Sequence, residues 1–258
     1  MMRRALALLS FIALLVPAAA RAQEAVVAGM SQNRVSITAN FDGSEILIFG
    51  AVKRDTPPPP DKPLQVIVTV SGPQKPVTVR RKEHRYGIWI NTAAVEIAAA
   101  PTFYAVATTG PLETILDKDE DRKYKVSIPL AIGDVKMPEE GADAQAFIQA
   151  LIRIRTRSGL YQLKPGSVNL SQETLFDTSV ALPSALTEGR YTTRILLTRG
   201  GRVVDEFRTS IDVRKVGLEK FLYTLAHERP LIYGLFSLFI AIVAGWGASV
   251  IFARLKQR

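Results

Sequence analysis

The chain of 258 residues contains no cysteine, and this absence excludes several kinds of protein. Disulfides cannot staple the fold, so its stability has to come from the burial of apolar side chains. Thiol catalysis, thiolate metal sites and a lipid anchor on cysteine are excluded as well. The only histidines are His84 and His227, which lie far apart in the sequence, so a histidine-rich metal cluster is not expected.

Motifs of the common enzyme families are also missing. The sequence has no G-x-S-x-G, no glycine-rich phosphate loop and no H-E-x-x-H, and its carboxylates form no recognisable catalytic pair. We therefore predict that the protein is not an enzyme and uses no cofactor. An envelope enzyme is the least favoured alternative.

The net charge of +9 raises the question of a nucleic-acid partner. Of the 33 Lys and Arg residues, six lie at the two ends of the chain, which leaves 27 facing 24 Asp and Glu in between. The basic excess therefore serves targeting and membrane topology, and no nucleic-acid partner is predicted. The six terminal residues are Arg3, Arg4, Arg21, Arg254, Lys256 and Arg258.

The first residues have the pattern of a secretory signal peptide. A basic MMRR is followed by the apolar ALALLSFIALLV and by small residues, with an A-x-A site at residues 20–22. We predict that residues 1–22 are removed and that the exported chain begins at Gln23. A retained N-terminal anchor is the alternative.

Residues 231–253 form a run of 23 positions without a charged side chain. At about 1.5 Å per residue such a helix spans about 34 Å, enough for a hydrocarbon core of about 30 Å. The basic tail, residues 254–258, indicates by the positive-inside rule that the C-terminus is cytoplasmic. The sequence thus predicts a single-pass inner-membrane protein with its body, residues 23–229, in the periplasm.

Small residues recur along one face of this predicted membrane helix. Such faces let helix backbones approach closely, which predicts a membrane-protein partner as well as the lipid bilayer. The alternative is that membrane helices are simply rich in small residues. Just before the helix, residues 217–229 carry apolar side chains at helical spacing and predict a juxtamembrane amphipathic helix. The small-residue face comprises Gly234, Ser237, Ala241, Gly245 and Ala248.

The exported body reads as mainly β, with two immunoglobulin-like β-sandwich domains. Residues 23–116 contain short alternating runs separated by turn residues and predict the first domain. Residues 117–142 are charged and then rich in Pro and Gly, which predicts a linker, although residues 124–132 have the pattern of a strand. The runs in the first domain are 34–39, 45–52, 64–70, 76–80, 86–90 and 102–107.

Residues 143–216 predict a second β-rich domain that begins with a helix. Asp143 has the pattern of an N-cap and Gly159 that of the residue after the C-cap, with Phe147, Leu151 and Ile154 on one helical face. Strands follow at 167–170, 175–182, 191–197 and 202–213, and Gly200-Gly201 predicts a two-residue hairpin turn. Tyr191 after LTEGR resembles the tyrosine corner of immunoglobulin-like sandwiches.

The densest run of positive charge comprises Arg80, Arg81, Lys82 and Arg85, with Trp89 shortly after. Arginine forks bind oxyanions and aromatic rings stack beside them, so these five residues predict a site for a small anion. The alternative, which we favour, is a solvated hairpin in which Trp89 belongs to the core.

Three stretches resemble the alphaproteobacterial putative transmembrane protein family: RRKEHRYGIWIN, FIQALIRIRTRSGLY and VRKVGLEKFLYTLAHERPLIYGLF, the last followed by Gly245-Trp246. The resemblance covers nearly the whole chain, and residues 215–234 are its most specific part. It implies a signal peptide, a periplasmic body and one C-terminal helix, and it defines no catalytic residues. It also implies a partner, because members are encoded beside permeases that resemble sulfite/organosulfonate exporters.

The sequence therefore favours an accessory subunit without enzymatic activity, attached to a multispanning membrane protein of that exporter type. A periplasmic module that binds a small anion is the second hypothesis.

Overall fold

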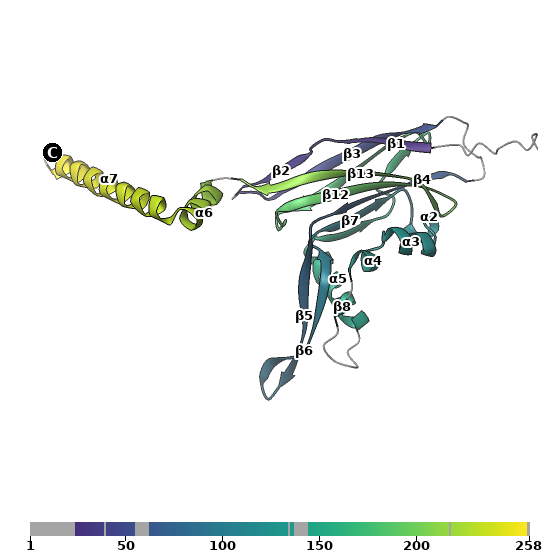
Figure 1. Cartoon of the computed structure of the whole chain (residues 1–258), viewed down its shortest axis with the longest axis horizontal. Helices are drawn as coiled ribbons and strands as arrows, with labels where there is room; N and C mark the ends of the chain where they lie inside the picture. Colours follow the sequence, from purple (N-terminus) through teal and green to yellow (C-terminus); the bar gives the residue numbers. More distant parts are fainter. Residues whose placement is uncertain are drawn as a thin grey trace, which may run out of the picture.

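The computed structural model describes residues 24–38, 40–54, 62–133, 135–136, 144–216 and 218–256 (Figure 1). The predicted signal peptide and the N-cap at Asp143 lie outside the described residues. A β-rich body forms one end of the molecule, and two consecutive helices extend from it and form the other end. These are α6 (Leu218–Glu228) and α7 (Pro230–Lys256). The predicted fold class, mainly β with one apolar C-terminal helix, is confirmed.

The strands of the described residues form three sheets. Sheet A has the order β1 (Glu24–Met30), β3 (Gly43–Arg54), β11 (Leu175–Pro183), β10 (Asn169–Ser171). Sheet B has the order β2 (Arg34–Ile37), β13 (Arg202–Lys215), β12 (Gly189–Arg199), β4 (Leu64–Ser71), β7 (Tyr104–Thr108), β9 (Tyr161–Lys164). Sheet C consists of β5 (Gln74–Arg85), β6 (Ile88–Pro101) and β8 (Val135–Lys136). Most pairs are antiparallel, but β2 with β13 and β7 with β9 are parallel.

Sheet B is the central layer of the body, because apolar side chains cover both of its faces. On one face Val66, Val68 and Ile195 pack in a core cluster with residues of sheet A such as Ile48 and Phe176. On the other face Ile67, Tyr104 and Leu196 belong to a second cluster with residues of sheet C and the helices. This double burial explains why β4 is an almost continuous apolar run rather than a simple alternation.

The structure differs from the predicted division into two sandwiches. Strand β3 pairs with β11 along the whole of Leu175–Pro183, and β4 pairs with β12 from Leu64 to Ser71. The ranges 23–116 and 143–216 therefore contribute strands to the same two sheets. Alternation of apolar side chains marks a strand, but it carries little information about which distant strand becomes its neighbour.

The predicted linker, residues 117–142, is largely built into the body. It follows α2 (Leu112–Ile115) and contains α3 (Lys118–Tyr124), α4 (Ile128–Ala131) and β8. Val126 and Ile132 are buried in the second cluster, and Asp121 Oδ1 accepts the backbone N–H groups of Val126 (3.1 Å) and Ser127 (2.8 Å). The strand-like pattern at 124–132 was misleading, because its apolar residues serve short helical turns that cover sheet B.

The helix predicted after the linker is confirmed as α5 (Ala144–Arg157). Phe147 and Leu151 are buried, and Gly159 has the positive φ of 70° that ends such helices. Ile154 was expected on the same buried face but is exposed. Arg155 Nη1 donates to the carbonyl of Thr102 (3.1 Å), which ties the end of the helix to the start of β7.

Two local predictions in the second half are also confirmed. The Tyr191 hydroxyl donates to the carbonyl of Thr187 at 2.8 Å, four residues upstream, which is the bond expected of a tyrosine corner. Gly200 and Gly201 have φ values of 53° and 80°, as the tight turn between β12 and β13 requires.

A buried ion pair fastens the first strand of the body. Arg199 of β12 donates through Nε and Nη2 to the two carboxylate oxygens of Glu24 (2.8 and 2.7 Å) and through Nη2 to Glu173 (3.0 Å). The hydrogen bonds with Glu24 are the largest cause that raises the pKa of Arg199 above its ordinary value. The side chains of Arg199 and Glu24 are only 6% and 7% exposed, so each depends on the other.

Replacing Arg199 by Leu should lower the free energy of unfolding by about 3 kcal/mol, because the buried Glu24 carboxylate loses both hydrogen bonds from Arg199 and, among the described residues, keeps only Arg54, whose Nε lies 3.7 Å away. The control is Arg190→Leu on the same strand, where the exposed pair with Asp212 at 3.9 Å is worth at most about 1 kcal/mol. Denaturant titration of the full chain in detergent measures both. Equal losses for the two variants would contradict the assigned role of Arg199.

Two buried tyrosines predict how stability depends on alkaline pH. Burial raises the pKa of Tyr104 and of Tyr161 from 10.0 to about 12, and their hydroxyls donate to the carbonyls of Val126 and Pro101, both at 2.8 Å. Between about pH 10 and pH 12 the unfolded chain releases these protons while the folded chain keeps them. The contribution of these two tyrosines to the free energy of unfolding is therefore fully present below pH 10. Between about pH 10 and pH 12 it should fall by about 1.4 kcal/mol per pH unit for each tyrosine.

Denaturant titrations across this pH range measure the slope. The variants Tyr104→Phe and Tyr161→Phe should each reduce it, whatever they cost in absolute stability. An unchanged slope in the double variant would show that other groups cause the alkaline loss.

Candidate functional site

The most prominent surface feature is the hairpin of β5 and β6, which projects from the side of the body (Figure 1). Its base is anchored in the second core cluster by Val79, Val95 and Ile97. Beyond the base, every side chain from Arg80 to Thr92 is exposed or half-buried. We call these residues, 80–92, the arm.

The end of the arm is a tight turn whose geometry follows from its sequence. Tyr86 and Gly87 have φ values of 51° and 82°, and the pairing continues on both sides of them, with Arg85 opposite Ile88. Positive φ at both central residues is the two-residue turn that suits the twist of hairpins. Gly87 adopts it without strain, and the side chain of Tyr86 is left pointing into solvent.

The pairing register divides the arm into two faces, because residues directly opposite each other share a face. His84 lies opposite Trp89 and Lys82 opposite Asn91 on the first face. The rings of His84 and Trp89 meet edge to face at 5.3 Å. On the second face Glu83 lies opposite Ile90, and Arg85 opposite Ile88.

The five residues predicted to bind an anion are therefore brought to one arm but not to one face. Arg80, Lys82 and His84 are two residues apart along β5, so they point to the same face. This is the first face, which also carries Trp89. Arg81 and Arg85 lie on the second face. The arm is solvated, as the favoured alternative expected, but the placement of Trp89 in the core was wrong, since 68% of its surface is exposed.

The two faces also differ in how their charge is used. Glu83 accepts hydrogen bonds from Arg85 Nη2 (2.8 Å) and Nε (3.2 Å), and it lies 3.4 Å from Arg81 Nε. The hydrogen bonds from Arg85 are the largest cause that holds the pKa of Glu83 below its ordinary value. Within the part of the chain that the structure describes, Arg80 and Lys82 have no carboxylate partner within 4 Å. Their charges remain available on the first face.

Apolar exposure on the arm is the part of the site that sequence reasoning missed. Tyr86 is fully exposed, Ile88 is 61% exposed, and Ile90 is exposed on the same face as Ile88. Alternation of apolar and polar residues in 86–90 predicted a half-buried strand. The feature of the sequence that could have predicted this exposure is the length of β5 and β6, which have 12 and 14 residues. Hairpin strands of this length extend beyond the core that covers their base.

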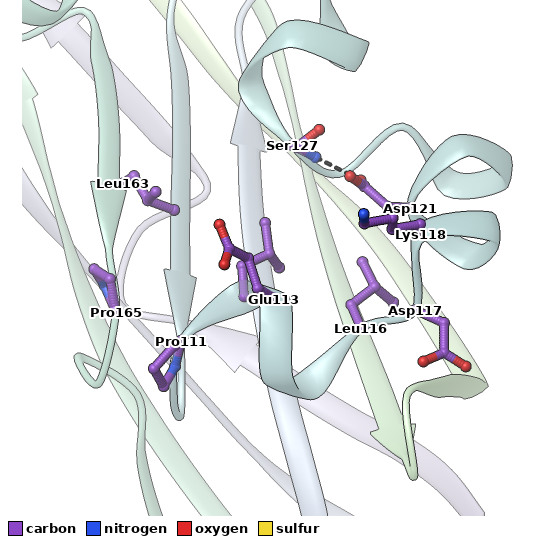
Figure 2. A pocket seen from close by; sticks show the side chains of 10 residues that line it. Pro111, Glu113, Leu116, Asp117, Lys118, Asp121, Ser127, Leu163 and Pro165 are labelled. Carbon is purple, nitrogen blue, oxygen red and sulfur yellow. Dashed lines mark hydrogen bonds between the residues drawn. The ribbon is translucent and has the colours of Figure 1, made fainter.

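A second feature is a pocket of about 790 Å³ beside α2 and α3. Figure 2 shows Leu163 and Pro165 on one side, Leu116 and Asp121 on the other, and Glu113 between them. Asp121 already accepts the Ser127 N–H, the bond drawn there. Among the described residues no group of three His, Cys, Asp or Glu side chains is arranged to hold a metal ion. Sequence analysis did not predict this pocket.

The third feature is α7, which contains the whole of the predicted span 231–253. Its segment Pro230–Ser249 has a mean hydropathy of 2.0, and none of it is buried against the body. The hydroxyl of Ser237 donates to the carbonyl of Tyr233 (2.8 Å), so its polar group is satisfied within the helix. Length, hydropathy and exposure together make α7 a candidate membrane-spanning helix.

Comparison with protein families agrees with this helix. A family model described as "Putative transmembrane protein (Alph_Pro_TM)" matches residues 25–254. The chain belongs to this family. The match covers the β-rich body as well as α7, so the predicted resemblance is confirmed over nearly the whole chain. As a transmembrane protein of this family, the chain is associated with a lipid bilayer. No curated protein and no solved structure matches the chain.

The arm should be energetically separate from the body that carries it. Trp89→Ala should change the free energy of unfolding by less than about 0.5 kcal/mol, because the indole is exposed. Ile97→Ala, lower on the same strand and fully buried, should cost about 2–5 kcal/mol. Denaturant titrations followed by far-UV circular dichroism measure both. A large loss for Trp89→Ala would mean that the arm folds as part of the core.

Proposed function

We propose that this chain is an accessory subunit without enzymatic activity, held in the membrane by α7 beside a multispanning membrane protein. The observation that carries the proposal is the uncovered helix. Its own body does not bury the segment Pro230–Ser249, so both lipid and a neighbouring helix have access to it.

One face of α7 is suited to close helix packing. Gly234, Ser237, Ala241, Gly245 and Ala248 follow one another at steps of three and four residues and therefore share a face. Around Gly234 and Gly245, apart from the adjacent residues and the backbone of the same helix, no atom of the described residues lies within 4 Å of the place where a Cβ would stand. A facing helix backbone has room there, and such close approach favours association of membrane helices.

The direction of the chain follows from its charges. The basic residues at 254–258 favour a cytoplasmic C-terminus, and the signal-peptide pattern of 1–22 favours export of the body. In a bacterium with two membranes the β-rich body then lies in the periplasm. The proposed partner is an exporter of the sulfite/organosulfonate type, as the family resemblance implies.

A small-anion site on the arm is the second candidate, and the geometry supports it less. The five basic and aromatic residues are divided between two faces, and Glu83 already engages Arg81 and Arg85. No enclosed cavity is formed by these exposed side chains that would remove an anion from water.

Substitution on the small-residue face tests the proposal. The full chain is purified from its native membrane in mild detergent, and proteins that accompany it are identified. The variant Ala241→Leu/Gly245→Leu fills the face, whereas Ile240→Leu/Val243→Leu changes larger neighbouring residues with little change in volume. A packing energy of about 1–2 kcal/mol predicts at least fivefold lower recovery of a multispanning partner with the first variant.

The control variant should recover the partner as the unchanged chain does. Equal recovery with both variants would show that the small-residue face does not hold the partner. Recovery of no multispanning protein with the unchanged chain would reduce α7 to a simple anchor.

A further inference from the structure

The end of the arm presents apolar side chains on both of its faces. Trp89 is exposed on the first face, Ile88 and Ile90 on the second, and Tyr86 at the turn itself. A surface that docks flat on a partner has one apolar face and one solvated face. Apolar groups all around the end of a ribbon are suited to insertion into a surrounding medium.

A second observation is the positive charge beside these apolar side chains: Arg85 lies opposite Ile88 next to the turn, and Lys82, Arg81 and Arg80 follow toward the body. The arm contains four basic residues and one carboxylate, that of Glu83, so its net charge is +3 with His84 neutral. Basic side chains behind an apolar tip match the order of layers in an anionic membrane, where phosphate groups lie outside the hydrocarbon. Arginine forks bind phosphate oxygens in two-point contacts.

We propose that the tip of the arm inserts into the headgroup region of an anionic lipid bilayer, as a second membrane contact besides α7. Trp89 and Tyr86 are of the two residue types enriched at the level of lipid headgroups. Arg80 and Lys82, whose charges are not engaged by Glu83, bind lipid phosphates beside Trp89. The inference rests on the membrane anchor and is independent of any protein partner of α7.

The arm also needs such a surface for its own order. Among the described residues no third strand pairs with the arm, because β8 pairs only with Glu96 and Ile97, and the arm is therefore a two-stranded ribbon. Two-stranded ribbons are at best marginally stable in water. Insertion of the tip fixes the ribbon and removes its apolar side chains from water.

Contact of the tip with the bilayer fixes how the body lies on the membrane. The arm projects across the long axis of the body, and α6 and α7 leave from one end (Figure 1). For the tip to reach the bilayer that α7 crosses, the body has to lie along the membrane surface with the arm toward it.

The sequence allows a direct test, because the chain has only two tryptophans. In the full chain, Trp246→Phe leaves Trp89 as the sole indole. The variant is reconstituted in vesicles of phosphatidylcholine alone or mixed with phosphatidylglycerol, with brominated acyl chains in parallel samples. We expect the emission of Trp89 to shift to shorter wavelength and to be quenched by the brominated lipid, most strongly in the anionic vesicles.

Charge reversal supplies the matched control. Arg80→Glu/Lys82→Glu on this background should abolish the shift and the quenching in anionic vesicles. Arg190→Glu/Arg214→Glu makes the same change of net charge at exposed positions of the body and should leave both signals in place.

Three results would overturn the proposal. The first is emission of Trp89 as a fully hydrated indole, without quenching, in anionic vesicles. The second is a shift to shorter wavelength that depends on protein concentration and is insensitive to brominated lipid, which would assign the tip to a protein surface. The third is a shift produced by free inorganic phosphate in detergent solution without lipid, which would assign the basic residues to a small anion. Recovery of a partner through α7 has no bearing on these signals.

Discussion

The structure of the body depends on one constraint, the burial of sheet B on both faces. A sheet covered on one side could form a simple sandwich with sheet A. Here the second face also carries apolar side chains, among them Ile67, Tyr104 and Leu196, and these have to be shielded as well. Three parts of the chain cover that second face: the base of the hairpin, the short helices that follow β7, and helix α5. The segment between the two predicted domains is therefore part of the folded body and not a spacer.

This arrangement also separates the scaffold from the surfaces available for interaction. Several polar groups inside the body hold it together, among them the pair of Arg199 with Glu24 and the hydroxyls of Tyr104 and Tyr161. Large apolar side chains are exposed on the arm and on α7, and four more, Val27, Leu47, Phe49 and Leu175, are exposed on sheet A. The arm and α7 both project from the body, where lipid or other proteins have access to their apolar side chains.

Sequence reasoning succeeded where the determining interactions are local. The spacing of Phe147 and Leu151 with Gly159 defined α5, the pair Gly200-Gly201 defined a hairpin, and Tyr191 defined its corner. The uncharged run to Ala253 defined the membrane helix without any tertiary information. It failed where the outcome depends on distant partners. Pairing of β3 with β11 joins residues far apart in the chain, and no local pattern specifies it. Trp89 was misplaced for the same reason, because an alternating strand looks alike whether or not a second layer covers it.

Hydrogen exchange on the full chain in nanodiscs tests most directly whether the two halves form one scaffold with the arm outside it. The account predicts that amides in β3 and β4 exchange with the same opening free energy as those in β11 and β12. Amides of the arm should exchange far faster than any of these in the absence of anionic lipid. Two distinct opening free energies, one for strands before residue 116 and another for strands after residue 143, would contradict the account and restore two separate domains.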